Sequence, residues 1–341
     1  MLGGPFGIGH NYAVCLGKLA LDDRVLLAKL AAGPLSGDAL ARDFGLTRAA
    51  VWKRIQHLRA AGIDIQGRAG DGYSLAHPVE LLDRGAILEA LPAAARAGLA
   101  DLEVAWTLES TNTELLARPV PRTGAAVLLA ERQTGGRGRR GRQWASPLAS
   151  HVYLSLSRSF AGGLAQLAGL SLAVGVAAAE ALRADGFGSV GLKWPNDLLD
   201  ADRKLGGLLI EGGGELGGPA RAVIGLGVNV HMPAAFAIDI GQPWVDLDTL
   251  AGAPVSRNRV VAALLAHLLP AMEQFEREGL APFLSRYAAL DVLAGRRVRV
   301  EEAGQWHEGV ALGLAGDGAL RVRTEGGERS FHAGEVSVRP A

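Results

Sequence analysis

The chain has 341 residues, which is long enough for two or three domains. Hydrophobic residues make up 49% of the chain. Because 35 basic residues balance 35 acidic ones, the chain as a whole is not a polyanion binder, and any contact with nucleic acid must come from a local basic patch. The single cysteine, Cys15, excludes a disulfide framework and a thiolate metal cluster and fits a reducing compartment. Since no positive charge precedes Lys18, the signal-peptide pattern is missing, and we expect a soluble cytoplasmic protein without a membrane span.

Residues 1–20 are glycine-rich and aperiodic and predict a flexible extension, whereas residues 21–77 predict a winged helix-turn-helix. Helices are expected over 24–32, from Ser36 to about Phe44 and, capped by Thr47, over 48–61. A hairpin over 63–75 follows, with its turn at Asp71-Gly72. The outward face of the third helix is expected to contact DNA through Arg48, Trp52, Lys53, Gln56 and Arg59. A small helical domain with a solvated basic face is the alternative.

Residues 78–290 predict a mixed sheet flanked by helices, and residues 291–341 a small β-barrel. Helices are expected over 79–91, 164–183 and 257–278. Strands of the larger sheet are expected over 104–108, 125–130, 151–157, 190–194, 204–210 and 222–230. Those of the barrel are expected over 297–301, 306–314, 319–324, 330–332 and 336–339.

The segment from Gly136 to Trp144 combines four arginines with three glycines. Arginine binds phosphate or carboxylate through a planar fork of donors, and glycine lets the backbone approach a ligand closely. Like charges repel and no apolar residue offsets the ordering entropy, so we expect this loop to order around an anion. Disordered RNA-binding tails have similar composition, and the neighbouring residues must decide between the two.

Four other motifs help to decide between an ordered anion site and a disordered RNA-binding tail. The pair Thr111 and Glu114 fits a capping box, although such a helix start also holds neutral polar ligands. Gln133, at a strand end, offers a donor and an acceptor. Asp197 follows a strand ended by proline, and Lys204 lies on the next strand, either as a functional pair or as a structural ion pair. The glycines of Gly225-Leu226-Gly227-Val228-Asn229 indicate a close approach to a strand backbone, and Trp244 is either core or a stacking surface.

In this order and spacing, from about Arg24 to Arg339, the motifs resemble those of the bifunctional biotin protein ligases, which are biotin-operon repressors that also activate biotin. The resemblance implies an α+β multidomain fold. Its parts are an N-terminal winged helix-turn-helix, a central mixed sheet with flanking helices like that of class II synthetases, and an SH3-like C-terminal β-barrel. It also implies ATP-dependent formation of biotinyl-5′-adenylate with Mg²⁺ present, followed by transfer of biotin to a lysine.

The resemblance further implies roles for individual residues. Those implied in catalysis are Lys204, Asp197 and Arg139. Those implied in biotin binding are Ser110, Thr111, Asn112, Gln133, Gly136, Arg137, Gly138, Arg139 and Lys204. Those implied in nucleotide binding are Arg139, Arg142, Trp144, Lys193, Asn196, Asn229 and Trp244. No metal ligands are assigned.

The implied partners are a biotin carboxyl carrier protein, operator DNA and a second copy of the chain in a ligand-promoted homodimer. Three alternatives are a lipoate-type ligase, a ligand-sensing repressor without ligase activity, and a ligase whose winged helix no longer regulates transcription. Retention of Lys204, Asp197 and the arginine-rich loop argues against the sensing-only alternative. Asp38, Asp43, Asp64 and Asp71 dilute the positive charge of the N-terminal domain, so the sequence supports ligation more strongly than repression.

Overall fold

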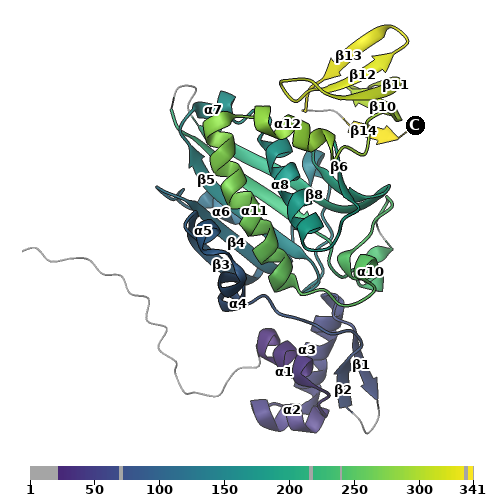
Figure 1. The fold of residues 1–341 in the computed structure, drawn as a ribbon. Helices are drawn as coiled ribbons and strands as arrows, with labels where there is room; N and C mark the ends of the chain where they lie inside the picture. Colours follow the sequence, from purple (N-terminus) through teal and green to yellow (C-terminus); the bar gives the residue numbers. More distant parts are fainter. Residues whose placement is uncertain (1–21, 69–71, 215–217, 239, 334–336, 341) are drawn as a thin grey trace, which may run out of the picture. The chain divides into compact units, whose positions relative to one another are not determined.

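The computed structural model describes residues 22–68, 72–214, 218–238, 240–333 and 337–340 (Figure 1). The predicted extension over 1–20 and Asp71 of the predicted hairpin turn lie outside the described residues. The chain divides into two compact units, of which the first comprises Met1–Ala60 and Ile65–Ala76 and the second Ala61–Asp64 and His77–Ala341.

The first unit is a three-helix domain with a two-stranded hairpin, as the sequence predicted. Its elements are α1 (Asp23–Ala32), α2 (Gly37–Phe44), α3 (Arg48–Ala60), β1 (Ile65–Arg68) and β2 (Gly72–Leu75). Ser36 caps α2 by accepting from the Ala39 amide at 3.0 Å, and Thr47 accepts from the Ala50 amide at 3.2 Å before α3. The predicted inner face of α3, namely Val51, Ile55 and Leu58, is fully buried.

The second unit is built on a seven-stranded mixed sheet in the order β3-β4-β5-β9-β8-β7-β6. Only β3 and β4 run parallel, and the other neighbours are antiparallel. The strands are β3 (Leu99–Leu108), β4 (Ala125–Gln133), β5 (Val152–Phe160), β6 (Val190–Lys193), β7 (Asp197–Asp200), β8 (Arg203–Gly214) and β9 (Ala220–Val228). The predicted mixed sheet is therefore confirmed.

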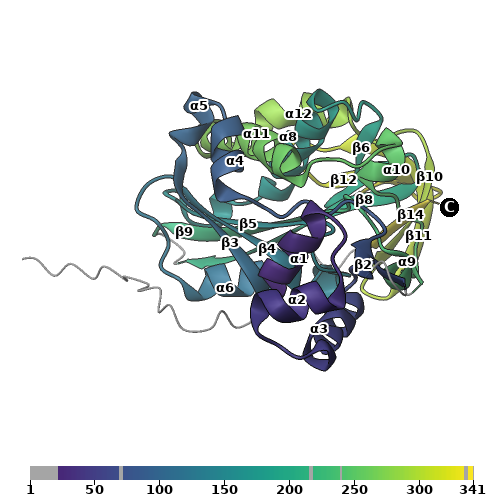
Figure 2. The ribbon, with the colours of Figure 1, turned by 90° about the horizontal axis from the view of Figure 1, so that it is seen from below.

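Helices lie on both faces of this sheet, with more of them on one face than on the other. Figure 2 shows α4, α8 and α11 on one face and α6 on the other. The helices are α4 (Arg84–Ala90), α5 (Ala93–Arg96), α6 (Thr111–Ala117), α7 (Gly163–Gln166), α8 (Leu170–Ala184), α9 (Ala234–Ala237), α10 (Leu247–Ala251), α11 (Arg257–Glu278) and α12 (Ala281–Ala288). The main core lies between the sheet and the larger helical layer. The strand ends and loops near α6 are thereby left for polar side chains.

Several predicted boundaries differ from the structure. The predicted helix over 79–91 begins only at Arg84, where the Asp83 side chain caps it. The predicted helix over 164–183 is two helices, because Gly169 between them adopts φ 81°. The polypeptide turns back directly after Pro195 and forms β7, a four-residue strand that the sequence interpretation did not separate from the turn.

One helical segment, Gly163–Ala184, is long and apolar enough to cross a membrane by length and composition alone. Residues 159–179 carry no charge, so composition alone does not exclude a membrane span at this position. In the structure α8 is a core helix: most of its residues are buried, and it packs on α11. Burial within the core accounts for this composition.

The C-terminal part is a five-stranded antiparallel sheet in the order β13-β12-β11-β10-β14 (Figure 1). Its strands are β10 (Arg297–Glu302), β11 (Gln305–Leu314), β12 (Leu320–Thr324), β13 (Gly327–Phe331) and β14 (Ser337–Pro340). Every predicted strand of this part is present within a few residues, with β13 beginning earlier. The Trp194 indole Nε1 donates to the Gly318 carbonyl at 3.1 Å and ties this sheet to the central one.

Candidate functional site

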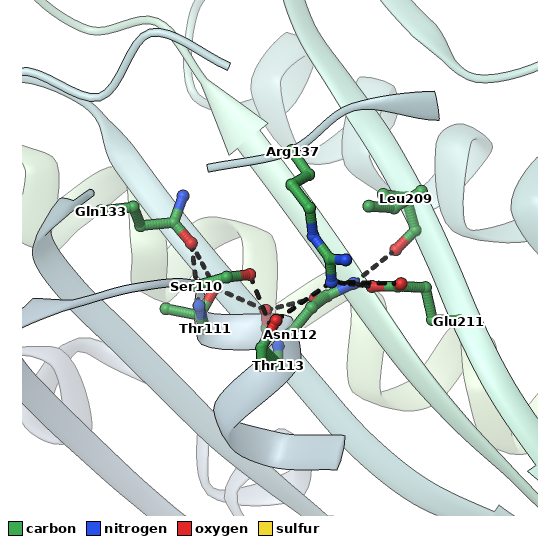
Figure 3. Close-up of polar contacts among 9 residues, drawn as sticks. Ser110, Thr111, Asn112, Thr113, Gln133, Arg137, Leu209 and Glu211 are labelled. Atoms are coloured by element: carbon green, nitrogen blue, oxygen red, sulfur yellow. Dashed lines mark hydrogen bonds and ion pairs between the residues drawn. The ribbon is translucent and has the colours of Figure 1, made fainter. Parts of the chain in front are cut away.

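Short polar side chains gather where α6 begins (Figure 3). Ser110 is the N-cap of α6, and Thr111 is its first helical residue, so the interpretation of Thr111 as the cap of a box with Glu114 was wrong. The Thr111 hydroxyl is instead available to its neighbours. The backbone amide and Oγ1 of Thr111 both donate to Gln133 Oε1, at 2.8 and 3.1 Å, which joins the helix start to the end of β4.

Asn112 extends this cluster into the interior. Its side chain is buried, and Nδ2 donates to the Leu209 carbonyl at 3.2 Å and to Glu211 Oε2 at 2.8 Å. Ser155 Oγ lies 2.6 Å from Asn112 Oδ1. A Cβ added to Gly225 would lie only 2.5 Å from Asn112 Oδ1, so the glycine makes room for this amide. The predicted close approach to this strand therefore exists, and Asn112 holds the cluster together.

The arginine loop, residues 136–144, has a defined conformation. The backbones of Arg137 and Gln143 form an isolated antiparallel β-bridge. The Gly138 amide donates to the Arg142 carbonyl at 2.7 Å, and the Trp144 amide donates to the Gly136 carbonyl at 2.9 Å. The expectation that the loop orders around an anion stays a prediction. Its backbone closes on itself like the end of a hairpin, which offsets part of the ordering cost.

Carboxylates from distant strands pair with two arginines of the loop. Arg137 Nη2 lies 3.0 Å from Thr113 Oγ1 and 3.3 Å from Glu211 Oε1, so the loop closes over the cluster at α6 (Figure 3). Arg140 lies 3.0 Å from Glu301 of the C-terminal sheet. Both arginines are partly exposed, so screening keeps each pair weak, on the order of 1 kcal/mol or less. An anionic ligand could exchange with these carboxylates.

Arg139 is the most deeply placed arginine of the loop. Its Nη1 donates to Asn196 Oδ1 at 3.2 Å. Burial lowers the pKa of the Arg139 guanidinium, the charge of Asp197 opposes this, and the like charges of Arg140 and Arg142 add to the lowering. The loop thus crowds positive charge at a partly desolvated position. A bound phosphate would relieve that crowding.

Lys204 and Asp197 form a close ion pair on adjacent strands. Lys204 Nζ lies 2.6 Å from Asp197 Oδ1, and both side chains are more than four-fifths buried. The geometry follows from the register of β7 and β8, in which Leu199 faces Lys204 and Asp197 faces Gly207. Asn196, next to Asp197, donates from Nδ2 to the Leu208 carbonyl at 2.8 Å. The predicted lysine and aspartate are therefore brought together beside Asn196 and Arg139.

Trp144, the last residue of the arginine loop, lies beside this ion pair. Lys204 Nζ is 5.6 Å from the centroid of the Trp144 ring, within cation–π range. A Cβ on Gly227 would lie 2.7 Å from the indole, so only glycine lets the ring rest on β9. Because Gly225 and Gly227 face the same side of β9, the Asn112 and Trp144 positions are neighbours along one strand.

Asn229 and Trp244 shape the segment beside Lys204. The buried Asn229 donates from Nδ2 to the Lys204 carbonyl at 3.3 Å and the Val245 carbonyl at 3.1 Å. The Lys204 amide donates to the Pro243 carbonyl, and the backbones of Lys204 and Trp244 form an isolated parallel β-bridge. Asn229 therefore positions the Trp244 segment, and its implied place near the nucleotide stays a prediction.

The other predicted residues are placed as follows. Lys193 faces Asp197 in the β6–β7 pairing, Arg142 is exposed, Gly136 is buried and Gly138 partly buried. Sequence reasoning missed Glu211, Ser155 and Glu301. Small serines alternating within the apolar strand 151–157 were an available signal for Ser155. The acidic partners had no local signal, because strand pairing alone brings them to the loop.

The first unit presents the predicted basic face of α3. Trp52 is 54% exposed, and Arg48 and Lys53 are exposed as well. With its amide oxygen turned toward the donors, Gln56 accepts from Trp52 Nε1 at 3.3 Å. Arg59 also has a contact within the domain: its Nε and Nη2 both donate to the Ile65 carbonyl, at 2.9 and 2.6 Å. It therefore anchors the hairpin to α3.

Comparison with known proteins identifies three family regions in the chain. Residues 106–229 match the Biotin/lipoate A/B protein ligase family, residues 24–74 an HTH domain, and residues 294–339 the Biotin protein ligase C terminal domain. The chain is 40% identical to the bifunctional ligase/repressor BirA of Escherichia coli K12, with 93% of this chain and 97% of that protein covered. It is 35% identical to the biotin–[acetyl-CoA-carboxylase] ligase of Mycobacterium tuberculosis, over 71% and 90%.

Among solved structures, the biotin protein ligase from Aquifex aeolicus in complex with biotin and ATP has a similar fold. The TM-score is 0.62 at 24% sequence identity, and the match covers 71% of this chain and all of that one.

Proposed function

The chain belongs to the biotin protein ligase family, and from that premise we propose that it activates biotin with ATP and transfers biotin to a lysine of a carrier domain. The reaction is a nucleotidyl transfer to the biotin carboxylate followed by an acyl transfer to the acceptor lysine. A biotin carboxylate oxygen attacks the α-phosphorus of ATP and displaces pyrophosphate, giving biotinyl-5′-adenylate. The amine of the acceptor lysine then attacks the carbonyl of this mixed anhydride, and AMP leaves.

One observation carries this proposal: a partly buried cluster that contains Lys204 and Arg139 adjoins a cluster of neutral polar side chains along a single strand. At Gly225 the cluster of Thr111, Asn112 and Gln133 offers amide and hydroxyl groups without net charge. Such groups match the donors and acceptors of biotin's ureido ring. At Gly227 the strand faces Trp144, beside Lys204.

Lys204 and Arg139 are the charges that would act on the reacting atoms. Cations at a partly desolvated site stabilise the negative charge that develops on the phosphorus oxygens. Asp197 holds the Lys204 ammonium at 2.6 Å and so orients it before substrate binds. Once the adenylate has formed, we propose that Asp197 assists the incoming acceptor amine. Asn196 and Arg139 keep the phosphate side in register through their 3.2 Å hydrogen bond.

The arginine loop would act as a lid over the adenylate. A mixed anhydride hydrolyses when water reaches it, so a cover formed by Arg137 and Trp144 has a direct chemical purpose. The pairs with Glu211 and Glu301 hold the loop near its closed position. Mg²⁺ is proposed to arrive bound to the triphosphate. Asp197, the carboxylate beside Lys204, is already paired with that lysine.

The N-terminal unit supports a second role in transcription. We propose that it binds operator DNA through α3, using Arg48, Trp52, Lys53 and Gln56, with a ligand-promoted homodimer spanning two half-sites. The BirA relatives are described as bifunctional ligase/repressors. A cytoplasmic location would fit both roles. A band shift with and without biotinyl-adenylate tests this, and absence of any retarded complex would leave ligation as the sole activity.

The ligase proposal is tested by biotin-dependent exchange of label between pyrophosphate and ATP. Exchange isolates the first step and requires no carrier. We expect exchange with the wild type, and a loss of about 100-fold or more in Lys204→Gln. Lys53→Gln is the matched control, because it removes a lysine from the other unit and should affect DNA binding alone. Exchange that needs lipoate instead of biotin would favour a lipoate-type ligase, and no exchange with either acid would favour a ligand-sensing repressor.

A further inference from the structure

Two histidines and an aspartate converge outside the proposed active site. His77 Nε2 lies 3.0 Å from Asp248 Oδ2, and His231 Nδ1 lies 3.2 Å from the same oxygen. The two imidazole rings stack 3.7 Å apart with an interplanar angle of 10°. One potential ligand atom from each residue lies within 4.8 Å of the other two. Three donors from distant parts of the chain therefore point toward a common position.

The surrounding backbone holds this arrangement in place. Asp248 lies in α10, its amide donates to the Val230 carbonyl, and Oδ1 accepts from the Val255 amide at 2.8 Å, which leaves Oδ2 directed to the histidines. The His231 amide donates to the Ser150 carbonyl at 2.9 Å. All three side chains are partly buried, so they are shielded but remain accessible to a small ion. The cluster is thus preorganised by contacts that do not involve the ligand atoms.

The ligand types select the ion. Two neutral imidazoles and one carboxylate suit divalent late transition metals, whereas Mg²⁺ and Ca²⁺ prefer oxygen donors. We propose that His77, His231 and Asp248 bind a divalent transition-metal ion, with Zn²⁺ the best match, and that water completes the coordination.

Such an ion would constrain the segment that borders the active site. His231 and Asp248 lie at the two ends of the stretch that carries Trp244 and bonds to Lys204 through Pro243 and Val245. A metal bond to both would fix the ends of this stretch relative to one another. The consequence for Trp244 rests on the proposed function, but metal binding itself does not, so the two are measured separately.

The direct test is a titration of the full chain, after treatment with chelator and dialysis, with ZnCl₂ by isothermal titration calorimetry and with CoCl₂ by visible absorption. No biotin or ATP is present. We expect a site occupied at micromolar metal, with d–d absorption bands from bound Co²⁺. At a metal concentration about 100-fold above Kd, Zn²⁺ should raise the melting midpoint by roughly 5 °C.

Asp248→Asn is the informative variant, because the amide oxygen can still accept from the Val255 amide while the charged ligand is lost. We expect it to weaken Zn²⁺ binding by about 100-fold or more, and His231→Ala to do the same. His332→Ala is the matched control. It removes a histidine that lies 4.0 Å from Asp317, and among the described residues this pair is not part of a group of three potential metal ligands. Wild-type binding weaker than about 1 mM, or equal binding by Asp248→Asn and the wild type, would overturn the proposal.

Discussion

Gly227→Ala should damage the site through the Trp144 ring. The added methyl would lie 2.7 Å from the indole, and the ring must move by about 1 Å to reach ordinary carbon–carbon contact. Overpacking of this kind costs roughly 1–3 kcal/mol of stability. Trp144 also lies 5.6 Å from Lys204 Nζ and ends the arginine loop, so the displacement reaches the proposed phosphate site and the lid.

The assay is the rate at which preformed biotinyl-adenylate is lost from the purified protein, measured beside a urea denaturation curve. A displacement of about 1 Å near reacting groups lowers activity by up to roughly 100-fold, so we expect adenylate to be lost about 10- to 100-fold faster. Gly213→Ala is the matched control, because a methyl on that β8 glycine meets nothing within 4 Å. If the two variants lose the adenylate equally fast, Trp144 does not cover the site.

Three further outcomes are expected. Arg137→Ala, which loses the contacts to Thr113 and Glu211, should shorten the adenylate half-life more than it slows synthesis, and an unchanged half-life would exclude a lid role. Asp197→Asn should slow transfer to the carrier by about 10-fold or more while biotin affinity measured by calorimetry is largely kept, and normal transfer kinetics would contradict that role. Burial holds the pKa of His151 at about 3, below its ordinary 6.5, so the unfolded chain takes up a proton between these values and stability falls as pH drops through that window. The free energy of unfolding of His151→Asn, measured with urea at pH 6, 5 and 4 with chelator present, should fall less steeply with decreasing pH than that of the wild type. The two slopes should differ by at most ~1.4 kcal/mol per pH unit, and equal slopes would exclude a neutral buried imidazole.

The sequence predicted elements whose periodicity is strong or whose ends are capped. Helix α3 followed from Thr47 and from the spacing of Val51, Ile55 and Leu58, and the alternation of strands and helices indicated the mixed sheet. Strand β7 was missed because it has only four residues and follows a turn directly. The break before α8 was missed because a glycine inside a helical pattern is often tolerated, and only packing decides otherwise.

Among the site residues, those that are close in sequence could be predicted to meet, whereas those joined by long-range pairing could not. Lys204, Asp197 and Asn196 come together because they lie at or beside the short β7–β8 pairing, which the local sequence already implied. The acidic partners of the loop could not be predicted, since Glu211 and Glu301 reach it only through long-range pairing. The contacts of Asn229 could not be predicted for the same reason: its amide binds backbone carbonyls of two segments that meet only in the folded chain.

The central claim is that this site makes a covalent bond between biotin and a carrier lysine. The most direct measurement is intact-mass analysis of a purified biotin carrier domain after incubation with the protein, biotin and ATP. We expect the mass of one biotinyl group to appear on the carrier only when both small molecules are present, and Lys204→Gln to abolish it. An unmodified carrier, from a protein that nevertheless binds biotin, would contradict the claim and identify a sensor.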